Sequence, residues 1–301
     1  MRAILRGPLG ERMLAAAIAI WGIDVLLVDV LNVVPMSFYW FGFRVDTDWL
    51  LFVPIIAAMS VILLRRTLND WRTKEELSAE FEAARAMQER MVPPAADVKG
   101  YQIESAYFPA RHVGGDFFRI MPADNGAVLV VVGDVSGKGL GAAMTVAALA
   151  GALDNEFSRS PGEVLEHLNR ALLLRKGEGF VTCCAALLER SGKVRIANAG
   201  HLSPYTGGVD LPVEAALPLG LVDGVTYVET QLQIAEGEGL TFLSDGVVEA
   251  ANSAGELFGF ERTREISEKA ANEIAEAAKA WGQNDDITVV SVRLVEVTGT
   301  A

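Results

Sequence analysis

Four aspartates border apolar, strand-like segments in this chain of 301 residues. Asp116 stands in GGDFF, Asp134 in GDVSGKG, Asp245 in LSDGVV and Asp285 in NDDITVV. Strand ends are rigid platforms, and neighbouring glycines allow backbone carbonyls to approach an ion closely. Carboxylates gathered there repel one another and take up protons unless a cation neutralises them. A single Asp-Gly pair usually marks only a turn, but the four together predict an oxygen-ligand site for Mg²⁺ or Mn²⁺.

Two nucleotide-binding signatures share letters with these motifs. A Walker A loop needs a glycine five residues before its Gly-Lys pair, where this chain has Val132, and a Ser or Thr after the lysine, where it has Gly139. The GGDFF at 114–118 resembles the GGDEF signature of diguanylate cyclases but lacks the glutamate, and the cyclase fold leaves the two later aspartates unexplained. The sequence therefore disfavours both an NTPase and a cyclase.

The segments that carry these motifs mix strand and helix patterns from about residue 97 onward. The apolar periodicity predicts strands at 101–108, 116–121, 127–134, 180–188, 194–199, 226–234, 240–244 and 287–295, and helices at 140–157, 163–174 and 261–281. The strands cluster in runs instead of alternating one for one with helices, so an α+β sandwich is predicted and not a Rossmann sheet. The adjacent Cys183 and Cys184 lie in an apolar run and are expected to be buried strand residues, with no disulfide framework and no zinc spacing.

The motif set resembles that of the SpoIIE-type bacterial serine/threonine phosphatases, a branch of the metal-dependent PP2C (PPM) superfamily. The resemblance covers about residues 77–296 and follows the family's order: GGDFF, GDVSGKG, NAGH at 198–201, LSDGVVEA, ELFGF at 256–260 and NDDITVV. It implies a PP2C-like sandwich of two antiparallel β-sheets flanked by helices, with a two-metal site at one edge. It also implies hydrolysis of phosphoserine or phosphothreonine in a protein.

The resemblance assigns roles residue by residue. Asp134 matches the aspartate that bridges both ions, and Val135 matches the residue that offers a backbone carbonyl. Asp116 matches a ligand of one ion, while Asp245 and Asp285 match ligands of the other. Two Mn²⁺ or Mg²⁺ ions held in this way would share a hydroxide and direct it at phosphorus.

The roles of several other residues near the motifs stay open. Arg111 matches a phosphate-binding arginine of the eukaryotic branch, or it is a surface arginine. Asp286 could be an outer-shell residue beside the metal ligands. Ser136 stands where the eukaryotic branch has a proton-donating histidine, so the general acid is undefined. His112 and His201 are candidates by their proximity to motifs, with structural roles as the alternative.

The charge of the chain constrains its partners. Residues 95–301 hold 16 basic and 28 acidic residues, and the whole chain has a net charge of -13. An acidic domain of this kind repels phosphate backbones, so no nucleic-acid partner is expected. The resemblance implies a phosphorylated regulatory protein as partner, such as an anti-sigma-factor antagonist. The alternative function is a catalytically silent domain that binds a phosphoprotein and relays a signal.

Two apolar runs near the N-terminus predict a transmembrane hairpin. Residues 13–34 form an apolar run whose only charged residues are Asp24 and Asp29, and residues 49–64 carry no charge. Basic residues flank the pair outside and aromatic residues fill the loop between, which predicts cytoplasmic termini in an inner-membrane protein. The second run spans only about 24 Å against a core of ~30 Å. A signal peptide is the alternative for the first run, but no small-x-small cleavage site follows it.

A charged helical segment is predicted to connect the hairpin to the soluble domain. A stripe at 4-3-4-3 spacing suggests either a dimerising coiled coil or a single amphipathic helix packed on the next domain; it consists of Leu77, Phe81, Ala84, Gln88 and Met91. Pro93 and Pro94 end this helix. The predicted organisation is a transmembrane hairpin at 1–66, a helical linker at 67–94 and a phosphatase domain at 95–301.

Overall fold

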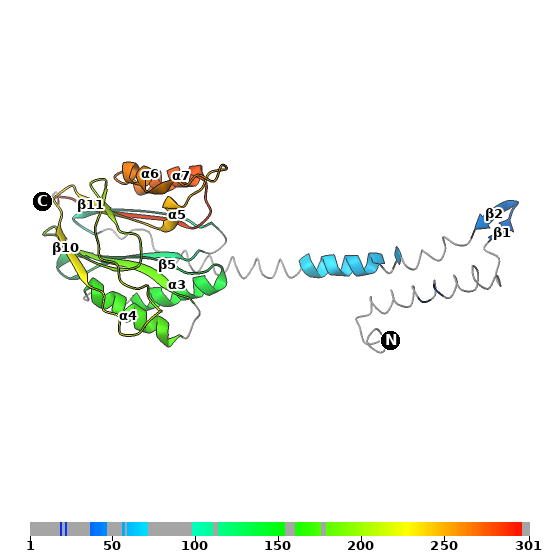
Figure 1. Cartoon of the computed structure of the whole chain (residues 1–301), viewed down its shortest axis with the longest axis horizontal. Coiled ribbons are helices and arrows are strands. Elements are labelled where there is room, and N and C mark those ends of the chain that lie inside the picture. The colour runs from blue at the N-terminus through cyan, green and yellow to red at the C-terminus, as the bar shows by residue number, and fades with distance from the viewer. Residues whose placement is uncertain are drawn as a thin grey trace. The chain divides into compact units, whose positions relative to one another are not determined.

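The computed structural model describes residues 19, 22, 37–46, 56–57, 59–71, 98–110, 114–153, 160–175 and 179–296. The chain divides into two compact units, Met1–Ala79 and Glu80–Ala301. Figure 1 shows the chain and labels several of its helices and strands.

The first unit contains a β-hairpin inside the segment that was predicted to be a loop. β1 (Ser37–Trp40) pairs with β2 (Phe43–Asp46), and the two residues between them, Phe41 and Gly42, both have positive φ angles, as a two-residue turn of type I′ requires. Residues 59–71 are helical. Within the described part of the chain, no helix is long and apolar enough to cross a membrane. The first predicted span lies largely outside the described residues, the second lies about half outside them, and the linker stripe lies entirely outside them. The transmembrane hairpin, the linker and the domain boundaries therefore stay predictions.

The second unit contains two five-stranded antiparallel sheets. The first sheet has the order β10-β7-β6-β5-β4 and the second has the order β3-β12-β11-β8-β9. The strands of the first are β4 (Asp116–Pro122), β5 (Val128–Val135), β6 (Val181–Leu188), β7 (Lys193–Ala199) and β10 (Glu229–Gln233). Those of the second are β3 (Tyr101–Phe108), β8 (Tyr205–Thr206), β9 (Val209–Asp210), β11 (Gly239–Leu243) and β12 (Ile287–Leu294).

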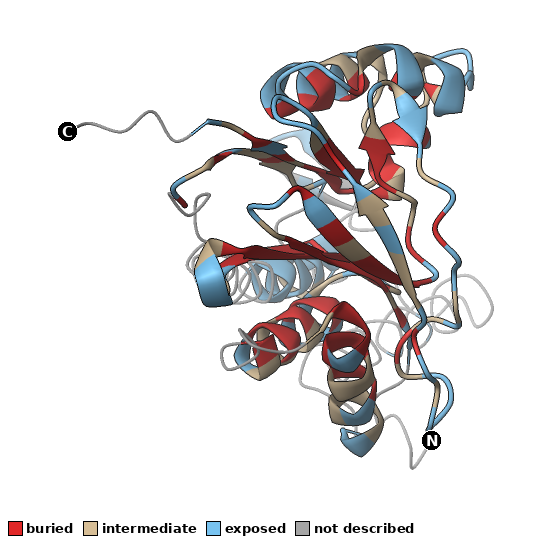
Figure 2. Cartoon of the chain, turned by 90° about the vertical axis from the view of Figure 1, so that its left-hand side faces the viewer, coloured by how far each residue is buried: buried red, intermediate tan, exposed pale blue. Residues whose placement is uncertain are grey.

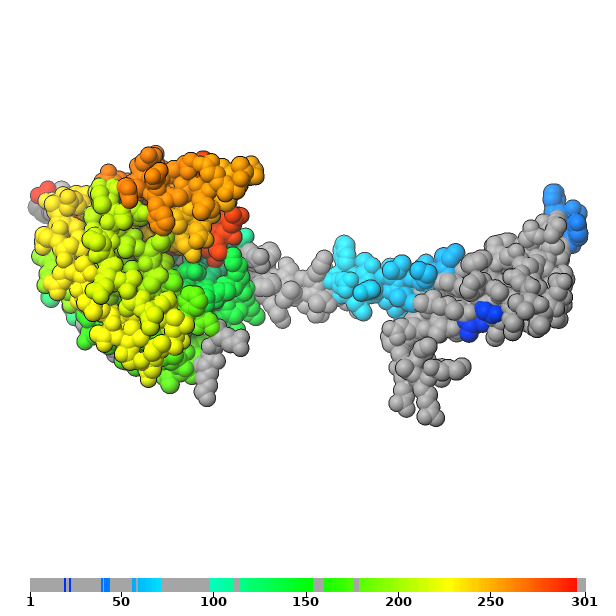
Figure 3. All heavy atoms as spheres, viewed as in Figure 1, coloured from blue at the N-terminus to red at the C-terminus, as the bar shows by residue number. Residues whose placement is uncertain are grey.

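Helices cover the outer face of each sheet and produce four layers (Figure 1). α3 (Leu140–Leu153) and α4 (Pro161–Leu174) lie on the first sheet, while α5 (Asp245–Val248), α6 (Gly259–Ile266) and α7 (Ala271–Trp281) belong to the side of the second. In Figure 2 the buried residues follow the two sheets and the inner faces of these helices. The segments after β7, yellow-green to yellow in Figure 3, cover much of one face of the domain. The predicted α+β sandwich of two antiparallel sheets flanked by helices is confirmed.

The central strands read as continuous apolar runs because both of their faces are buried. In β5, Leu129 and Val131 face the core under α3 and α4, whereas Val130 and Val132 face the core between the sheets. The neighbouring cysteines of β6 divide in the same way, and both are free and fully buried, as predicted. At about 25 cal/mol per Å² of apolar area, burial on both faces makes these strands the main source of hydrophobic stabilisation.

The predicted helix at 261–281 is wrong, because the structure has two helices there, α6 and α7, separated by residues 267–270. The Ser267 carbonyl accepts a hydrogen bond from the Thr241 hydroxyl, and the Ala271 N–H donates to the Glu104 carboxylate. These partners from other elements satisfy the backbone groups where one helix ends and the next begins. The predicted strand at 226–234 is shorter, since β10 covers only Glu229–Gln233.

Candidate metal centre

Asp116 and Asp134 lie directly opposite each other on adjacent strands. They are register partners at the start of β4 and near the end of β5. Asp116 is almost fully buried and accepts a hydrogen bond of 2.5 Å from the Thr288 hydroxyl of β12. The contact joins the first sheet to the second at the end where the motifs gather.

Asp245 and Asp285 flank the junction of β11 and β12 in the second sheet. Ser244, between β11 and Asp245, donates its backbone N–H to the Thr288 carbonyl, and its hydroxyl accepts from the Thr288 N–H and donates to the Asp286 carbonyl. These bonds hold the end of β11 against the start of β12. Asp245 opens α5 and Asp285 precedes β12, so the tie keeps both carboxylates in the same region.

The GDV segment approaches the loop before β4 closely. The Val135 N–H donates to the Gly115 carbonyl at 3.1 Å. A Cβ on Gly115 would lie 2.8 Å from the Val135 carbonyl oxygen and 3.0 Å from Oδ1 of Asp134. Only glycine permits this approach, which leaves the Val135 carbonyl oxygen beside the carboxylates.

The aspartates perturb one another electrostatically. Burial raises the pKa of Asp116 well above its usual range, and the neighbouring Asp134 raises it further. Burial, with the charges of Asp245 and Asp285, raises the pKa of Asp134 to about 6. The pKa of Asp245 is also raised, first by burial and then by Glu249 and Asp285. Such mutual repulsion is typical of carboxylates that share a site and need a cation.

All four predicted aspartates thus occur at one end of the sandwich. Within the described residues, no three acidic, histidine or cysteine side chains converge tightly enough to hold one ion among them. Mg²⁺ and Mn²⁺ fit this looser arrangement, because such ions keep several waters and need direct contact with only one or two of the carboxylates around them. The donor set, carboxylates and the Val135 carbonyl, is composed entirely of oxygen and suits these hard ions.

The Asp286 carboxylate binds backbone at both ends of the loop between β3 and β4. Its Oδ1 accepts from the Ala110 N–H at 2.8 Å and its Oδ2 from the Gly115 N–H at 2.7 Å. A Cβ on Gly114 would overlap this carboxylate. Both carboxylate oxygens of Asp286 therefore hold backbone beside the predicted metal ligands. Arg111 and His112 lie outside the described residues, so their predicted roles stay predictions.

The structure gives Ser136 and His201 structural contacts. The Ser136 hydroxyl accepts from the Phe180 N–H at 2.8 Å and so holds the start of β6. The His201 Nδ1 lies 3.0 Å from the Thr182 hydroxyl, and Nε2 is buried without a hydrogen bond of normal geometry. Burial lowers the pKa of His201 to about 4, so this ring is neutral near pH 7 and cannot donate a proton as an imidazolium.

Three contacts among and beside the four aspartates were not predicted from the sequence. Thr288 bonds Asp116, Ser244 joins two strand ends, and the Lys138 ammonium lies 2.7 Å from Oδ2 of Asp285. Thr288 and Ser244 stand within the quoted motifs, so their position beside aspartates was the available signal. The Lys138 contact spans 147 residues and left no local signal.

The fold and the acidic end of the sandwich define a PP2C-like domain. The SiaA-PP2C domain of Pseudomonas aeruginosa superimposes with a TM-score of 0.62 at 23% identity, covering 74% of this chain and 98% of that one. RsbX, solved in complex with magnesium, superimposes with a TM-score of 0.52 at 16% identity, covering 64% of this chain and 95% of RsbX. At these identities the likeness shows the fold alone.

The sequence family follows from a match to the model of Stage II sporulation protein E (SpoIIE) over residues 124–295, more than half of the chain. The chain belongs to this family, and the predicted resemblance is confirmed. The phosphoserine phosphatase RsbU of Bacillus subtilis is 25% identical over 194 residues, covering 61% of this chain and 58% of RsbU. Protein IcfG of Synechocystis is 27% identical over 261 residues, covering 71% of this chain and 41% of IcfG. The chain therefore spans less than two thirds of the length of these relatives.

Proposed function

We propose that this chain is a metal-dependent protein-serine/threonine phosphatase. The observation that carries the proposal is the opposed pair Asp116 and Asp134 at one end of the sandwich, with Asp245 and Asp285 near enough for their charges to raise the pKa of Asp134. Its membership of the SpoIIE family and the phosphatase named among its relatives support the same activity.

The residues divide between two ions in the proposed site. Asp134 would bridge both, with Asp116 and the Val135 carbonyl on one side and Asp245 and Asp285 on the other. Two bound ions would supply a hydroxide at neutral pH and neutralise charge on the phosphoryl group. Thr288 keeps Asp116 oriented through its hydroxyl, Ser244 keeps the two strand ends together, and Asp286 fixes the backbone at Gly115. Arg111 would bind the substrate phosphate.

The substrate in this proposal is a phosphoserine or phosphothreonine on a regulatory protein, such as an anti-sigma-factor antagonist. The proposed anchor is the N-terminal hairpin, with multi-pass insertion in the inner membrane and the catalytic domain in the cytoplasm. The proposed route to a homodimer is the linker helix at 67–94. The name of the RsbU relative supports phosphoserine as the substrate group.

The activity is tested by Mn²⁺-dependent hydrolysis of p-nitrophenyl phosphate and of a phosphoserine peptide by the purified full-length protein. We expect Asp134→Asn to lower kcat at least about 100-fold, since loss of a bridging ligand removes charge stabilisation from the transition state. The matched control is Asp124→Asn, because Asp124 is exposed in the β4–β5 connection; this variant should keep wild-type activity. No turnover by the wild type with saturating Mn²⁺ would favour the catalytically silent phosphoprotein-binding domain.

A further inference from the structure

Lys138 lies in a turn whose shape is set by two glycines. Gly137 and Gly139 flank the lysine with φ angles of 95° and 86°, and a Cβ on either would meet nothing within 4 Å. Glycine is therefore needed at both positions for its backbone conformation and not for lack of space, because residues with side chains disfavour positive φ. The turn connects β5 to α3 and brings the lysine to an aspartate 147 residues later in the chain.

The Lys138 ammonium contacts one specific oxygen of the Asp285 carboxylate. Its Oδ1 accepts the Asp286 N–H at 2.9 Å, and its Oδ2 accepts the Lys138 ammonium at 2.7 Å. An ion bound by Asp285 would need an oxygen of the same carboxylate. An ammonium and a divalent ion on one oxygen repel each other strongly, so the two cations exclude each other there.

Lys138 also affects Asp245, the residue that is predicted to bind the same ion as Asp285. Its positive charge lowers the pKa of Asp245, opposing the larger effects of burial and of the charges of Glu249 and Asp285. The lysine side chain is 46% exposed and the Asp285 side chain 41%. A half-exposed lysine on a flexible four-carbon stem can swing into solvent at low cost. Asp116 and Asp134, in contrast, have Thr288 and each other as close partners.

We propose that Lys138 is a tethered cation that competes with a divalent ion for Asp285, so that the two halves of the metal centre load with different affinities. This inference rests on the proposed function, because it concerns the loading of the same site. The Asp116 and Asp134 side takes up its ion without this competition. The Asp245 and Asp285 side takes up its ion only when the ammonium leaves, which makes that step the weaker one and makes activity depend on the concentration of free metal.

The test is calorimetric titration of Mn²⁺ into the full-length protein without substrate. Lys138→Met keeps the length of the side chain and removes the charge, and we expect it to tighten the weaker binding step up to about fivefold, the range of exposed ion pairs. Lys138→Arg keeps the charge and should leave that step no tighter than in the wild type. Lys269→Met removes the same charge from an exposed position between α6 and α7 and should change neither step.

The outcomes separate this inference from the proposed function. An unchanged or weaker second step in Lys138→Met would overturn the competition, while normal Mn²⁺ uptake by the wild type would leave the phosphatase proposal intact. An equal gain in Lys269→Met would also overturn it, because the effect would then come from overall charge. Absence of Mn²⁺ uptake in the wild type would overturn both.

Discussion

Asp134 is partly buried and lies near the charges of Asp245, Asp285 and Asp286. Both the burial and these charges disfavour its ionised form. Its pKa of about 6 lies above the ordinary value of 3.8. An acid with a raised pKa holds its proton in the folded state at pH values where the unfolded chain has released it. Without a bound cation, the contribution of Asp134 to stability therefore falls as the pH rises from about 4 to about 6. The proposed ligand set is thus a source of instability, which a bound divalent ion would relieve.

The Asp134→Asn substitution should therefore stabilise the protein in the presence of EDTA at pH 7. We expect an increase in the free energy of unfolding of about 1–3 kcal/mol, because a shift of one pKa unit corresponds to about 1.4 kcal/mol. At pH 4 or below the gain should largely vanish, since the wild-type carboxyl is then protonated in both states. Urea unfolding at the two pH values measures the difference, and equal or lower stability of the variant at pH 7 would contradict the electrostatic account.

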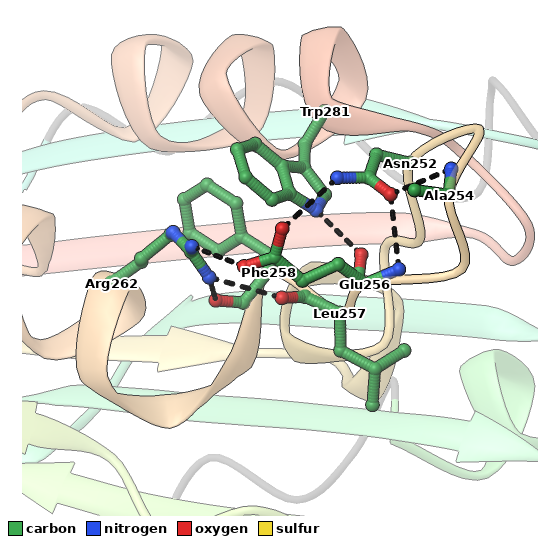
Figure 4. Close-up of polar contacts among 7 residues, drawn as sticks. All are labelled: Asn252, Ala254, Glu256, Leu257, Phe258, Arg262 and Trp281. Atoms are coloured by element: carbon green, nitrogen blue, oxygen red, sulfur yellow. Dashed lines mark hydrogen bonds and ion pairs between the residues drawn. The ribbon is translucent and has the colours of Figure 1, made fainter.

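At the scale of elements, the loop after α5 is held by a network that Figure 4 shows. The Asn252 side chain accepts from the Ala254 and Glu256 N–H groups, and the Trp281 Nε1–H donates to the Glu256 carbonyl at 2.8 Å. The Arg262 guanidinium lies 4.3 Å from the centroid of the Trp281 ring and bonds the Glu256 carboxylate. The ELFGF motif is therefore part of a fixed connection between α5, which begins at Asp245, and α6.

Trp281→Phe should loosen this connection while keeping an aromatic ring. The variant loses the indole donor and weakens the cation–π contact, which together predict a loss of about 1–2 kcal/mol in unfolding free energy. Hydrogen exchange should speed up at the amides of Ala254 and Glu256. Phe260→Leu is the matched control, because Phe260 is 57% exposed on the neighbouring helix, and it should change neither quantity. Unaltered exchange in Trp281→Phe would show that the loop holds without the indole.

The elements also show what local sequence can predict. β5 and β6 were predicted because burial on both faces leaves a continuous apolar run. The helix predicted at 163–174 begins two residues earlier, at Pro161, after a capping box formed by Ser160 and Glu163. The break between α6 and α7 was not predicted, because its partners Thr241 and Glu104 lie in other strands. The site divides in the same way: motifs located the aspartates, whereas the Thr288 and Lys138 contacts depend on chain segments that meet only in the fold.

At the scale of the whole molecule, the two sheets each supply half of the proposed centre. Asp116 and Asp134 come from the first sheet, and Asp245 and Asp285 adjoin the second. Thr288, in the second sheet, bonds Asp116 in the first, so the relative position of the sheets controls the spacing of the ligands. Packing of the buried core between the sheets therefore contributes to function as well as to stability.

Anomalous diffraction from crystals grown with Mn²⁺ tests the central claim most directly. The account predicts two peaks at the end of the sandwich, both in contact with Asp134, one also near Asp116 and the other near Asp245 and Asp285. The Asp134→Asn variant should lose at least one of them. Absence of both peaks from this end, or manganese bound only at other carboxylates, would contradict a two-ion centre built from these four aspartates.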